Sequence, residues 1–425
     1  MKKTITKMLL TLIIIGAVQL CNAQYTVNQV IVLNQGTYGQ TVPVTIGSYK
    51  PVTKLYQNFD NIPQARFSSY VIIDNGFIYA AADSFLIKYD LNTKQRLYMK
   101  TVQGIREIAV WNNQLLVTRG QTGPLPSYFQ VYGKDSLNFI YELPSVSQRA
   151  EGIKVLNDTA YVAINGFGTV GKLAIIDLNN HLENREIDFG PNGLNPYNVE
   201  VEPANGTIYT VNNMDYTNAS ITKYNVNTCT FVTTLLNQAN GCNGSTYYLN
   251  NVYFQMSGKT NIGEFSTSSL TVWDSLQINK PLLGIAIDSV NSNFYVGNTD
   301  FATYGEVYIY NLYGTVQDSF AVGIAPGNFA FDVRSSSGIN QVNDEAKVSV
   351  YPNPSHDFVT INYTRINQNE TITVQVIDVL GNIVETIKGT PNSVHTISLQ
   401  NFSSGIYSLK VTSDKAVTMA KLVKE

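Results

Sequence analysis

Short apolar segments alternate with polar turns along most of the chain, and three kinds of segment recur in a fixed order. The first kind is an apolar strand that ends in a turn, found at 71–76, 108–113, 153–158 and 285–288. The second is a short aromatic or aliphatic strand, found at 78–80, 115–117, 160–162, 208–210, 252–254 and 294–296. The third ends in an aromatic residue or Ile followed by a polar residue or Gly, found at 89–90, 132–133, 176–177, 224–225, 265–266 and 310–311. A more variable fourth strand follows, so each repeat predicts four short strands.

The spacing of the repeats predicts the fold. The second-strand segments recur about every 43 residues, and four short strands in ~40–45 residues are typical of a β-propeller blade. Two incomplete repeats stand at the ends of the array: 329–332 matches a first strand, whereas 30–34 and 44–46 match a second and a third strand. Joined, they complete one blade. We therefore predict an all-β chain in which residues 24–334 form a seven-bladed β-propeller, with six or eight blades as the alternatives.

The repeats resemble the YVTN class of bacterial propellers in their spacing and in their Tyr-Val-x-Asn-like strands. Residues 32–39, Val-Leu-Asn-Gln-Gly-Thr-Tyr-Gly, resemble the Asn-Glu-Gly-Asn-Phe-Gly signature of a family of secreted Bacteroidota propellers of unknown function. That family is akin to surface cobalamin-binding propellers. Gln35 and Thr37 replace the Glu and Asn of the signature, so the resemblance, over residues 28–334, implies the fold and not a ligand.

A second domain follows a linker rich in Ser, Gly, Asn and charge at 335–347. Residues 348–425 carry six short alternating strands, which predicts a small immunoglobulin-like β-sandwich. This segment closely resembles the type A C-terminal sorting domain of the type IX secretion system. The resemblance rests on four motifs, whose key residues are Tyr351, Pro352, Asn353, Pro354, Asp378, Gly381, Gly405, Tyr407, Lys421 and Lys424. It implies that the chain engages the type IX secretion machinery and is secreted or held at the outer cell surface.

The N-terminus has the pattern of a signal peptide at residues 1–23. Lys2, Lys3 and Lys7 precede a mostly apolar run at 8–20, and Cys21-Asn22-Ala23 supplies small residues for cleavage. The run is shorter than the ~20 residues needed to span a bilayer. We therefore expect export and a mature chain with no transmembrane segment; a membrane anchor, or a lipoprotein modified at Cys21, is the alternative.

Composition narrows the classes of function. The 28 Lys and Arg nearly balance 31 Asp and Glu, which excludes a polycationic nucleic-acid binder. With 27 Tyr and 18 Phe the chain favours strands. His181 is the only histidine before the sorting domain, and it follows a turn. We therefore predict no catalytic triad, no metal cluster and no cofactor. Cys229 and Cys242 form either a disulfide or two separate thiols.

Candidate binding residues can be placed from the expected topology. In a four-stranded meander, the loops between strands 2 and 3 open on the same face as the segments that lead into strand 1. These segments carry Asn, Tyr and Arg, which suit hydrogen bonding and stacking on a small polar or ring-bearing ligand. The residues expected to line this basin are Tyr38, Arg66, Arg106, Glu107, Arg119, Arg149, Glu151, Phe167, Tyr197, Asn198, Asn213, Asp215, Tyr216, Asp300 and Tyr304. The alternative is that these side chains only bond the backbone of their own loops.

The function expected from the sequence is that of a non-catalytic, monomeric binding module whose ligand is a small molecule, a glycan or a protein. One alternative is a lactonase- or lyase-like propeller enzyme, which would hold a divalent cation in the channel. Glu107, Glu151, Asn198 and Asn328 lie beside the starts of first strands and are the candidate ligands for that cation. A structural or adhesive surface protein is the other alternative.

Overall fold

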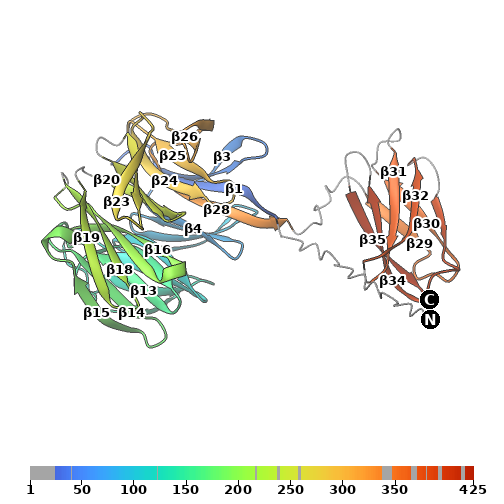
Figure 1. Ribbon diagram of the computed structural model, residues 1–425, viewed down its shortest axis with the longest axis horizontal. Helices are drawn as coiled ribbons and strands as arrows, with labels where there is room; N and C mark the ends of the chain where they lie inside the picture. Colours follow the sequence, from blue (N-terminus) through green and yellow to red (C-terminus); the bar gives the residue numbers. More distant parts are fainter. Residues whose placement is uncertain are drawn as a thin grey trace, which may run out of the picture. The chain divides into compact units, whose positions relative to one another are not determined.

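The computed structural model describes residues 24–425, except positions 40, 122, 216–217, 237–239, 257–259, 337–346, 365–370, 380, 391–394 and 413–416. The expected signal peptide at 1–23 lies outside the described residues. Thr26–Arg334 forms one compact unit, and Ser335–Glu425 belongs to another (Figure 1). Each unit is described by itself.

The first unit consists of four-stranded antiparallel sheets, of which the described residues form seven. Sheet 1 pairs β28 (Pro326–Ser336), β1 (Gln24–Asn34), β2 (Val44–Lys50) and β3 (Leu55–Ile62). Sheet 2 holds β4 (Ser68–Asp74), β5 (Phe77–Ala82), β6 (Phe85–Asp90) and β7 (Arg96–Thr101). Sheet 3 holds β8 (Ile105–Trp111), β9 (Gln114–Arg119), β10 (Phe129–Gly133) and β11 (Phe139–Glu142). Sheet 4 holds β12 (Ala150–Leu156), β13 (Thr159–Ile164), β14 (Lys172–Asp177) and β15 (Leu182–Asp188).

The remaining sheets of this unit repeat the same order. Sheet 5 holds β16 (Pro196–Glu202), β17 (Thr207–Asn212), β18 (Ala219–Asn225) and β19 (Thr230–Leu236), with short 3₁₀ turns η1 (Pro191–Gly193) and η2 (Pro203–Asn205) beside β16. Sheet 6 holds β20 (Asn240–Tyr248), β21 (Asn251–Met256), β22 (Asn261–Ser266) and β23 (Thr271–Gln277). Sheet 7 holds β24 (Leu282–Asp288), β25 (Asn293–Asn298), β26 (Glu306–Asn311) and β27 (Val316–Ala321).

The second strand of each sheet is apolar on both faces. In β5, Ile78 and Ala80 pack toward sheet 1, whereas Tyr79 and Ala81 pack toward sheet 3. This follows from the two-residue period of a strand, which sends alternate side chains to opposite faces. A run of consecutive apolar residues in the second strand therefore predicts a sheet that is covered on both sides.

Buried clusters join each sheet to the next. Such clusters lie between sheets 1 and 2, 2 and 3, 3 and 4, 4 and 5, 5 and 6, and 6 and 7. A seventh cluster joins sheet 7 back to sheet 1. In it the rings of Tyr49 and Phe320 stack with centroids 3.8 Å apart. Each of the seven sheets thus has a neighbour on both faces.

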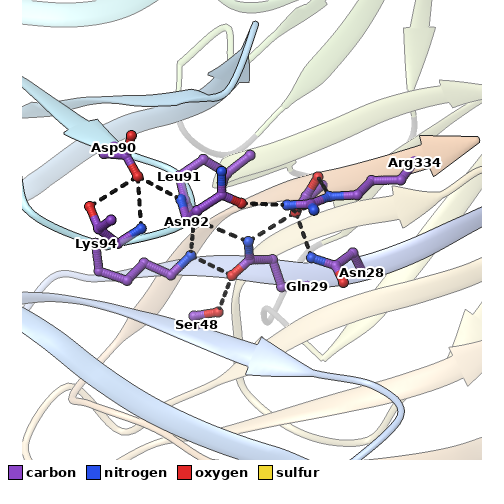
Figure 2. A network of polar contacts seen from close by, with 10 residues as sticks. Asn28, Gln29, Ser48, Asp90, Leu91, Asn92, Lys94 and Arg334 are labelled. Atoms are coloured by element: carbon purple, nitrogen blue, oxygen red, sulfur yellow. Dashed lines mark hydrogen bonds and ion pairs between the residues drawn. The ribbon is translucent and has the colours of Figure 1, made fainter. Parts of the chain in front are cut away.

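Sheet 1 is built from the two ends of the unit, as the incomplete repeats predict, because β28 pairs with β1. A polar network holds this junction (Figure 2). The carboxylate of Asp332 accepts hydrogen bonds from Asn28 Nδ2 at 2.9 Å, Gln29 Nε2 at 2.9 Å and Arg334 Nη2 at 2.8 Å. Lys94, in the turn before β7, donates to Gln29 Oε1, and Arg334 reaches Asn92 at 2.9 Å. The network therefore ties both ends of the unit to sheet 2.

The second unit contains two antiparallel sheets. One holds β29 (Lys347–Tyr351), β30 (Phe358–Thr364) and β33 (His395–Ser398). The other holds β32 (Ile383–Gly389), β31 (Ile372–Ile377), β34 (Gly405–Thr412) and β35 (Val417–Lys424). Both contribute to one buried cluster, for example through Val359 of β30 and Leu409 of β34.

Replacing Asp332 by Ala should destabilise the first unit by about 2–3 kcal/mol, since three donors would lose a buried acceptor. Burial by itself would raise the pKa of Asp332, but the hydrogen bonds from Arg334, Asn28 and Gln29 outweigh burial and lower it. The stability that Asp332 contributes is therefore complete above the ordinary Asp range and is lost as the pH falls through the lowered pKa. Denaturant unfolding at pH 7 and pH 3 measures both effects.

The matched control for this measurement is Asp274→Ala in the outer strand β23, where the carboxylate is exposed and bonds only the amide of Ser275 among the described residues. That variant should unfold like the wild type. Equal stabilities for Asp332→Ala and Asp274→Ala would show that the junction network contributes nothing.

Candidate functional site

A cavity of about 590 Å³ opens along the first strands of the seven sheets. Each first strand contributes to its wall: β28, β4, β8, β12, β16, β20 and β24. The walls are mainly polar, with Arg, Glu, Ser and Asn side chains between a few aromatic rings. A concave space on which several polar and aromatic side chains converge is a candidate ligand site.

Irregular pairing at the start of the first strands brings polar side chains to this cavity. The register with the second strand shifts near the beginning of β4, β8, β12, β16, β20 and β24. In β8 the shift leaves Arg106 and Glu107 between the paired residues Ile105 and Ile108. Such bulges aim extra side chains away from the regular sheet faces, and here those side chains line the cavity.

Three arginines and two phenylalanines form one wall, which we call the arginine–aromatic group: Arg66, Phe67, Arg106, Arg149 and Phe167. Arg66 binds both carboxylate oxygens of Asp83, at 2.8 and 2.7 Å. Arg149 Nε donates to Glu151 Oε1 at 2.7 Å, and the guanidinium lies 3.6 Å from the centroid of the Phe167 ring. Pairing with a carboxylate and stacking on a ring fix these guanidinium groups in place.

Arg106 is bound less completely than the other two arginines. Its Nε donates to the carbonyl of Gly120 at 2.8 Å and lies 3.6 Å from Glu151 Oε1. Its guanidinium lies 5.6 Å from the centroid of the Phe67 ring. Among the described residues, no hydrogen bond is recorded for Nη1 or Nη2 of Arg106, and the residue lines the cavity.

Farther along the first strands lies a second set of charges, the lysine cluster: Tyr70, Glu107, Lys154, Glu200 and Ser245. Lys154 Nζ donates to Tyr70 Oη at 3.1 Å. Ser245 Oγ donates to Glu200 Oε1 at 2.7 Å. Glu107 Oε2 accepts from the amide of Ile153 at 3.2 Å. The cluster joins sheets 2 to 6 across the cavity.

Burial sets the protonation of the lysine cluster. It raises the pKa of Glu107 to about 7, against the opposing effects of Lys154 and the Ile153 amide. Burial alone would lower the pKa of Lys154, but Tyr70, Glu200 and Glu107 together raise it. Lys154 is therefore an ammonium group at neutral pH, whereas Glu107 exchanges its proton there.

Nine of the expected basin residues line the cavity: Tyr38, Arg66, Arg106, Glu107, Arg149, Glu151, Phe167, Tyr197 and Asn198. Tyr216 lies outside the described residues. Five others do not line it: Arg119, Asn213, Asp215, Asp300 and Tyr304.

The placement of those five corrects the expectation. Arg119 is buried and donates to the carbonyls of Gln103 and Ser127 at 2.9 and 2.7 Å, so it braces a loop. Asn213 is buried and pairs with Asn195 through the backbone. Asp215 and Asp300 accept backbone amide hydrogens within their own turns. Tyr304 is 76% exposed, beyond the cavity wall.

Sequence reasoning did not select Tyr70, Lys154, Glu200 or Ser245 as site residues. A signal for two of them was present, because Lys154 and Glu200 each stand between apolar residues of a first strand. A charged residue in such a strand must find a partner inside the molecule. The partners themselves come from other sheets and cannot be read from local pattern.

All four candidate cation ligands line the cavity: Glu107, Glu151, Asn198 and Asn328. Two of them already have a positively charged neighbour, since Glu151 is paired with Arg149 and Lys154 acts on Glu107. Among the described residues, no group of three or more His, Cys, Asp or Glu side chains is placed to hold a metal ion.

Cys229 is a free, exposed thiol in this structure. Arg185 Nη2 donates to its Sγ at 2.8 Å, which lowers the pKa of the thiol. The side chain of Cys242 lies outside the described residues. Cys229 stands in the turn between β18 and β19, whereas position 242 is in the first strand of the next sheet. Of the two alternatives, a disulfide or two separate thiols, the structure has Cys229 as a separate thiol.

The motif residues of the second unit hold turns and strand ends together. Asn353 Nδ2 donates to the carbonyl of Lys421 at 2.6 Å, and its Oδ1 accepts from the amide of Val423 at 2.9 Å. Asp378 accepts from the backbone and side chain of Asn382 at 2.8 and 3.0 Å, in the turn with Gly381 at φ 88°. Tyr407 Oη donates to Ser403 O at 2.8 Å. The first motif thus fastens the last strand, β35.

Residues 349–425 match the family described as "Secretion system C-terminal sorting domain". This domain marks proteins exported by type IX secretion, so the chain is exported to the cell surface or the extracellular space. In the part of the chain that the structure describes, no helix has the length and apolar character needed to cross a membrane.

Comparison with solved structures supports a propeller-like fold for the first unit. The β-propeller domain of Cps50 (Swd1) from Myceliophteria thermophila is similar with a TM-score of 0.52 and 11% identity, over 68% of this chain and 98% of that one. Hydrazine synthase from Kuenenia stuttgartiensis is similar with a TM-score of 0.50 and 16% identity, over 61% of this chain and 88% of that one. Identities this low indicate the fold alone.

One curated protein, the ulvan lyase NLR42 of Nonlabens ulvanivorans, is 38% identical over 79 residues. The match covers 18% of this chain and 14% of the lyase. The chain therefore spans only a small part of that enzyme's length.

Substituting Glu107 by Gln should stabilise the first unit by roughly 2–3 kcal/mol at pH 8. The pKa of Glu107 is near 4.5 in the unfolded chain and about 7 in the folded chain. As the pH rises from 4.5 to 7, the unfolded chain therefore loses this proton while the folded chain keeps it. Wild-type stability should therefore fall over that interval, and the fall should be smaller in Glu107→Gln. Melting temperatures measured from pH 4.5 to pH 8 check this.

The control for this pH series is Glu385→Gln, an exposed position on β32 of the second unit. It should leave the melting profile of the first unit unchanged. Parallel profiles for the wild type and Glu107→Gln would show that Glu107 titrates normally.

Proposed function

We propose that Thr26–Arg334 is a closed seven-bladed β-propeller that binds a small polar ligand at or beyond the cell surface without catalysing a reaction. The second unit is proposed to be an immunoglobulin-like sandwich that directs export after a signal peptide at 1–23 has been cleaved. The ring is supported by the seven clusters, which leave no sheet with an uncovered face. The binding role is supported above all by the cavity on the first strands.

The cavity suits recognition for three reasons. Its volume of about 590 Å³ is of the size that small ligands occupy. The arginine–aromatic group offers rings and fixed donors, and the lysine cluster offers both donors and acceptors. Most of these side chains are held by partners within the protein, so they would lose little freedom on binding.

A second candidate function is enzymatic, and one observation favours it. Glu107 lines the cavity and has a pKa of about 7, which suits a general acid or base at neutral pH. The lactonase- or lyase-like enzyme expected as an alternative would then rely on Glu107 as a proton carrier. The binding role remains the main proposal, because burial accounts for this pKa without any reaction.

Removing Val348–Glu425 should leave a folded first unit that is retained in the periplasm. The core clusters of Thr26–Arg334 contain no residue of the second unit, so folding does not need it. Fractionation of cells that produce the full and shortened chains, with protease resistance as the test of folding, measures this. Equal amounts of the shortened chain in the medium would contradict a sorting role.

In a thermal-shift screen of small polar and ring-bearing compounds, those that bind the cavity should raise the melting temperature of the full chain. The gain should disappear in Ala286→Trp, because Ala286 lines the cavity and an indole would fill part of it. The matched control is Tyr304→Ala, which changes an exposed residue outside the cavity and should bind like the wild type. Compounds that stabilise the wild type and Ala286→Trp equally would place binding elsewhere.

A further inference from the structure

We propose that the ligand of this cavity is a small ring compound that carries an anionic group, and that Arg106 binds this group through its terminal nitrogens. The inference deepens the proposed function and rests on it. It follows from which charges in the cavity are already paired and which are not.

The arginine–aromatic group has more positive than negative charge. Asp83 uses both carboxylate oxygens on Arg66, and Glu151 Oε1 is held by Arg149. Three guanidinium groups therefore face two carboxylates. Arg106 is the one whose charge is not matched by a close partner, since it is 3.6 Å from a carboxylate oxygen that Arg149 already binds.

Arg106 lines the cavity, and its guanidinium group is held in position by contacts within the protein. The side chain is only 19% exposed, and its position is set by the bond from Nε to Gly120 and by the Phe67 ring. Nη1 and Nη2 have no recorded hydrogen bond to other described residues. A held guanidinium with free parallel donors matches the two oxygens of a carboxylate or a similar anion.

The surrounding rings define the rest of the ligand. Phe67 lies beside Arg66 and Arg106, and Phe167 lies beside Arg149, so apolar ring faces stand next to the donors. A flat ring attached to the anionic group would contact these faces while the anion meets Arg106.

The lysine cluster determines how such a ligand is oriented in the cavity. It holds two carboxylates, on Glu107 and Glu200, around the single ammonium of Lys154. This end of the cavity is neutral while Glu107 keeps its proton, and it carries one more negative than positive charge once Glu107 ionises, the reverse of the arginine–aromatic group. An anionic group is therefore attracted at Arg106 and not at the lysine cluster.

Benzoate and benzamide are suitable probes, because they share a ring and a shape and differ in charge. Titrations of the full chain at pH 7.5 and low salt, followed by calorimetry, should show benzoate binding about tenfold more tightly than benzamide. Arg106→Gln should weaken benzoate binding about tenfold and leave benzamide unchanged. Arg106→Lys, which keeps the charge but loses the paired donors, should fall between the two.

Arg185→Gln is the matched control, since Arg185 lies on the outer strand β15 and does not line the cavity. It should bind benzoate like the wild type, and melting temperatures should show that each variant is folded. Equal binding of benzoate and benzamide, or a benzoate affinity unaffected by Arg106→Gln, would overturn the anionic ligand. If neutral compounds from the thermal-shift screen still bind and are lost in Ala286→Trp, the binding function would stand without it. If no compound of any charge binds, both proposals fail.

Discussion

Every sheet of the first unit must be covered on both faces, and the rest of the structure depends on this constraint. The second strands are buried along nearly their whole length and place apolar side chains on both faces, so each sheet exposes two largely hydrophobic surfaces when it stands alone. A row of such sheets would leave one bare face at each end. The contact between sheets 7 and 1, with Tyr49 stacked on Phe320, removes both bare faces at once.

The same constraint creates the cavity. Sheets that all turn one edge toward a common centre bring their first strands together there. The strands approach closely at glycines: a Cβ on Gly284 would lie 2.2 Å from the carbonyl oxygen of Gly327, and one on Gly152 would lie 2.8 Å from that of Tyr197. Close backbone contact between sheets and bulged strand starts together leave room in the middle for side chains of opposite charge. The polar site thus results from the way in which the apolar faces of the sheets pack against each other.

Much of the fold could be predicted from the sequence, because its signals are local and repeated. The aromatic segments such as 78–80 and 294–296 mark second strands, and the unmatched segments at 30–34 and 329–332 mark the sheet shared by the two ends. The candidate site was predicted only in part. The expected topology put Arg106 and Glu107 on the face where the cavity lies, but it could not show that Arg119 is buried and donates to the carbonyls of Gln103 and Ser127. It also could not pair Lys154 with Tyr70, because the two residues are 84 positions apart in the chain.

The shared sheet also orders events in the life of the molecule. Its first strand in space, β28, is the last of the unit to be synthesised, and the sorting domain comes after it. A chain that ends early therefore lacks its export address whenever it lacks its closing strand. Export by this address selects for chains that carry everything needed to complete the fold, so the order of segments along the sequence works as a check on completeness.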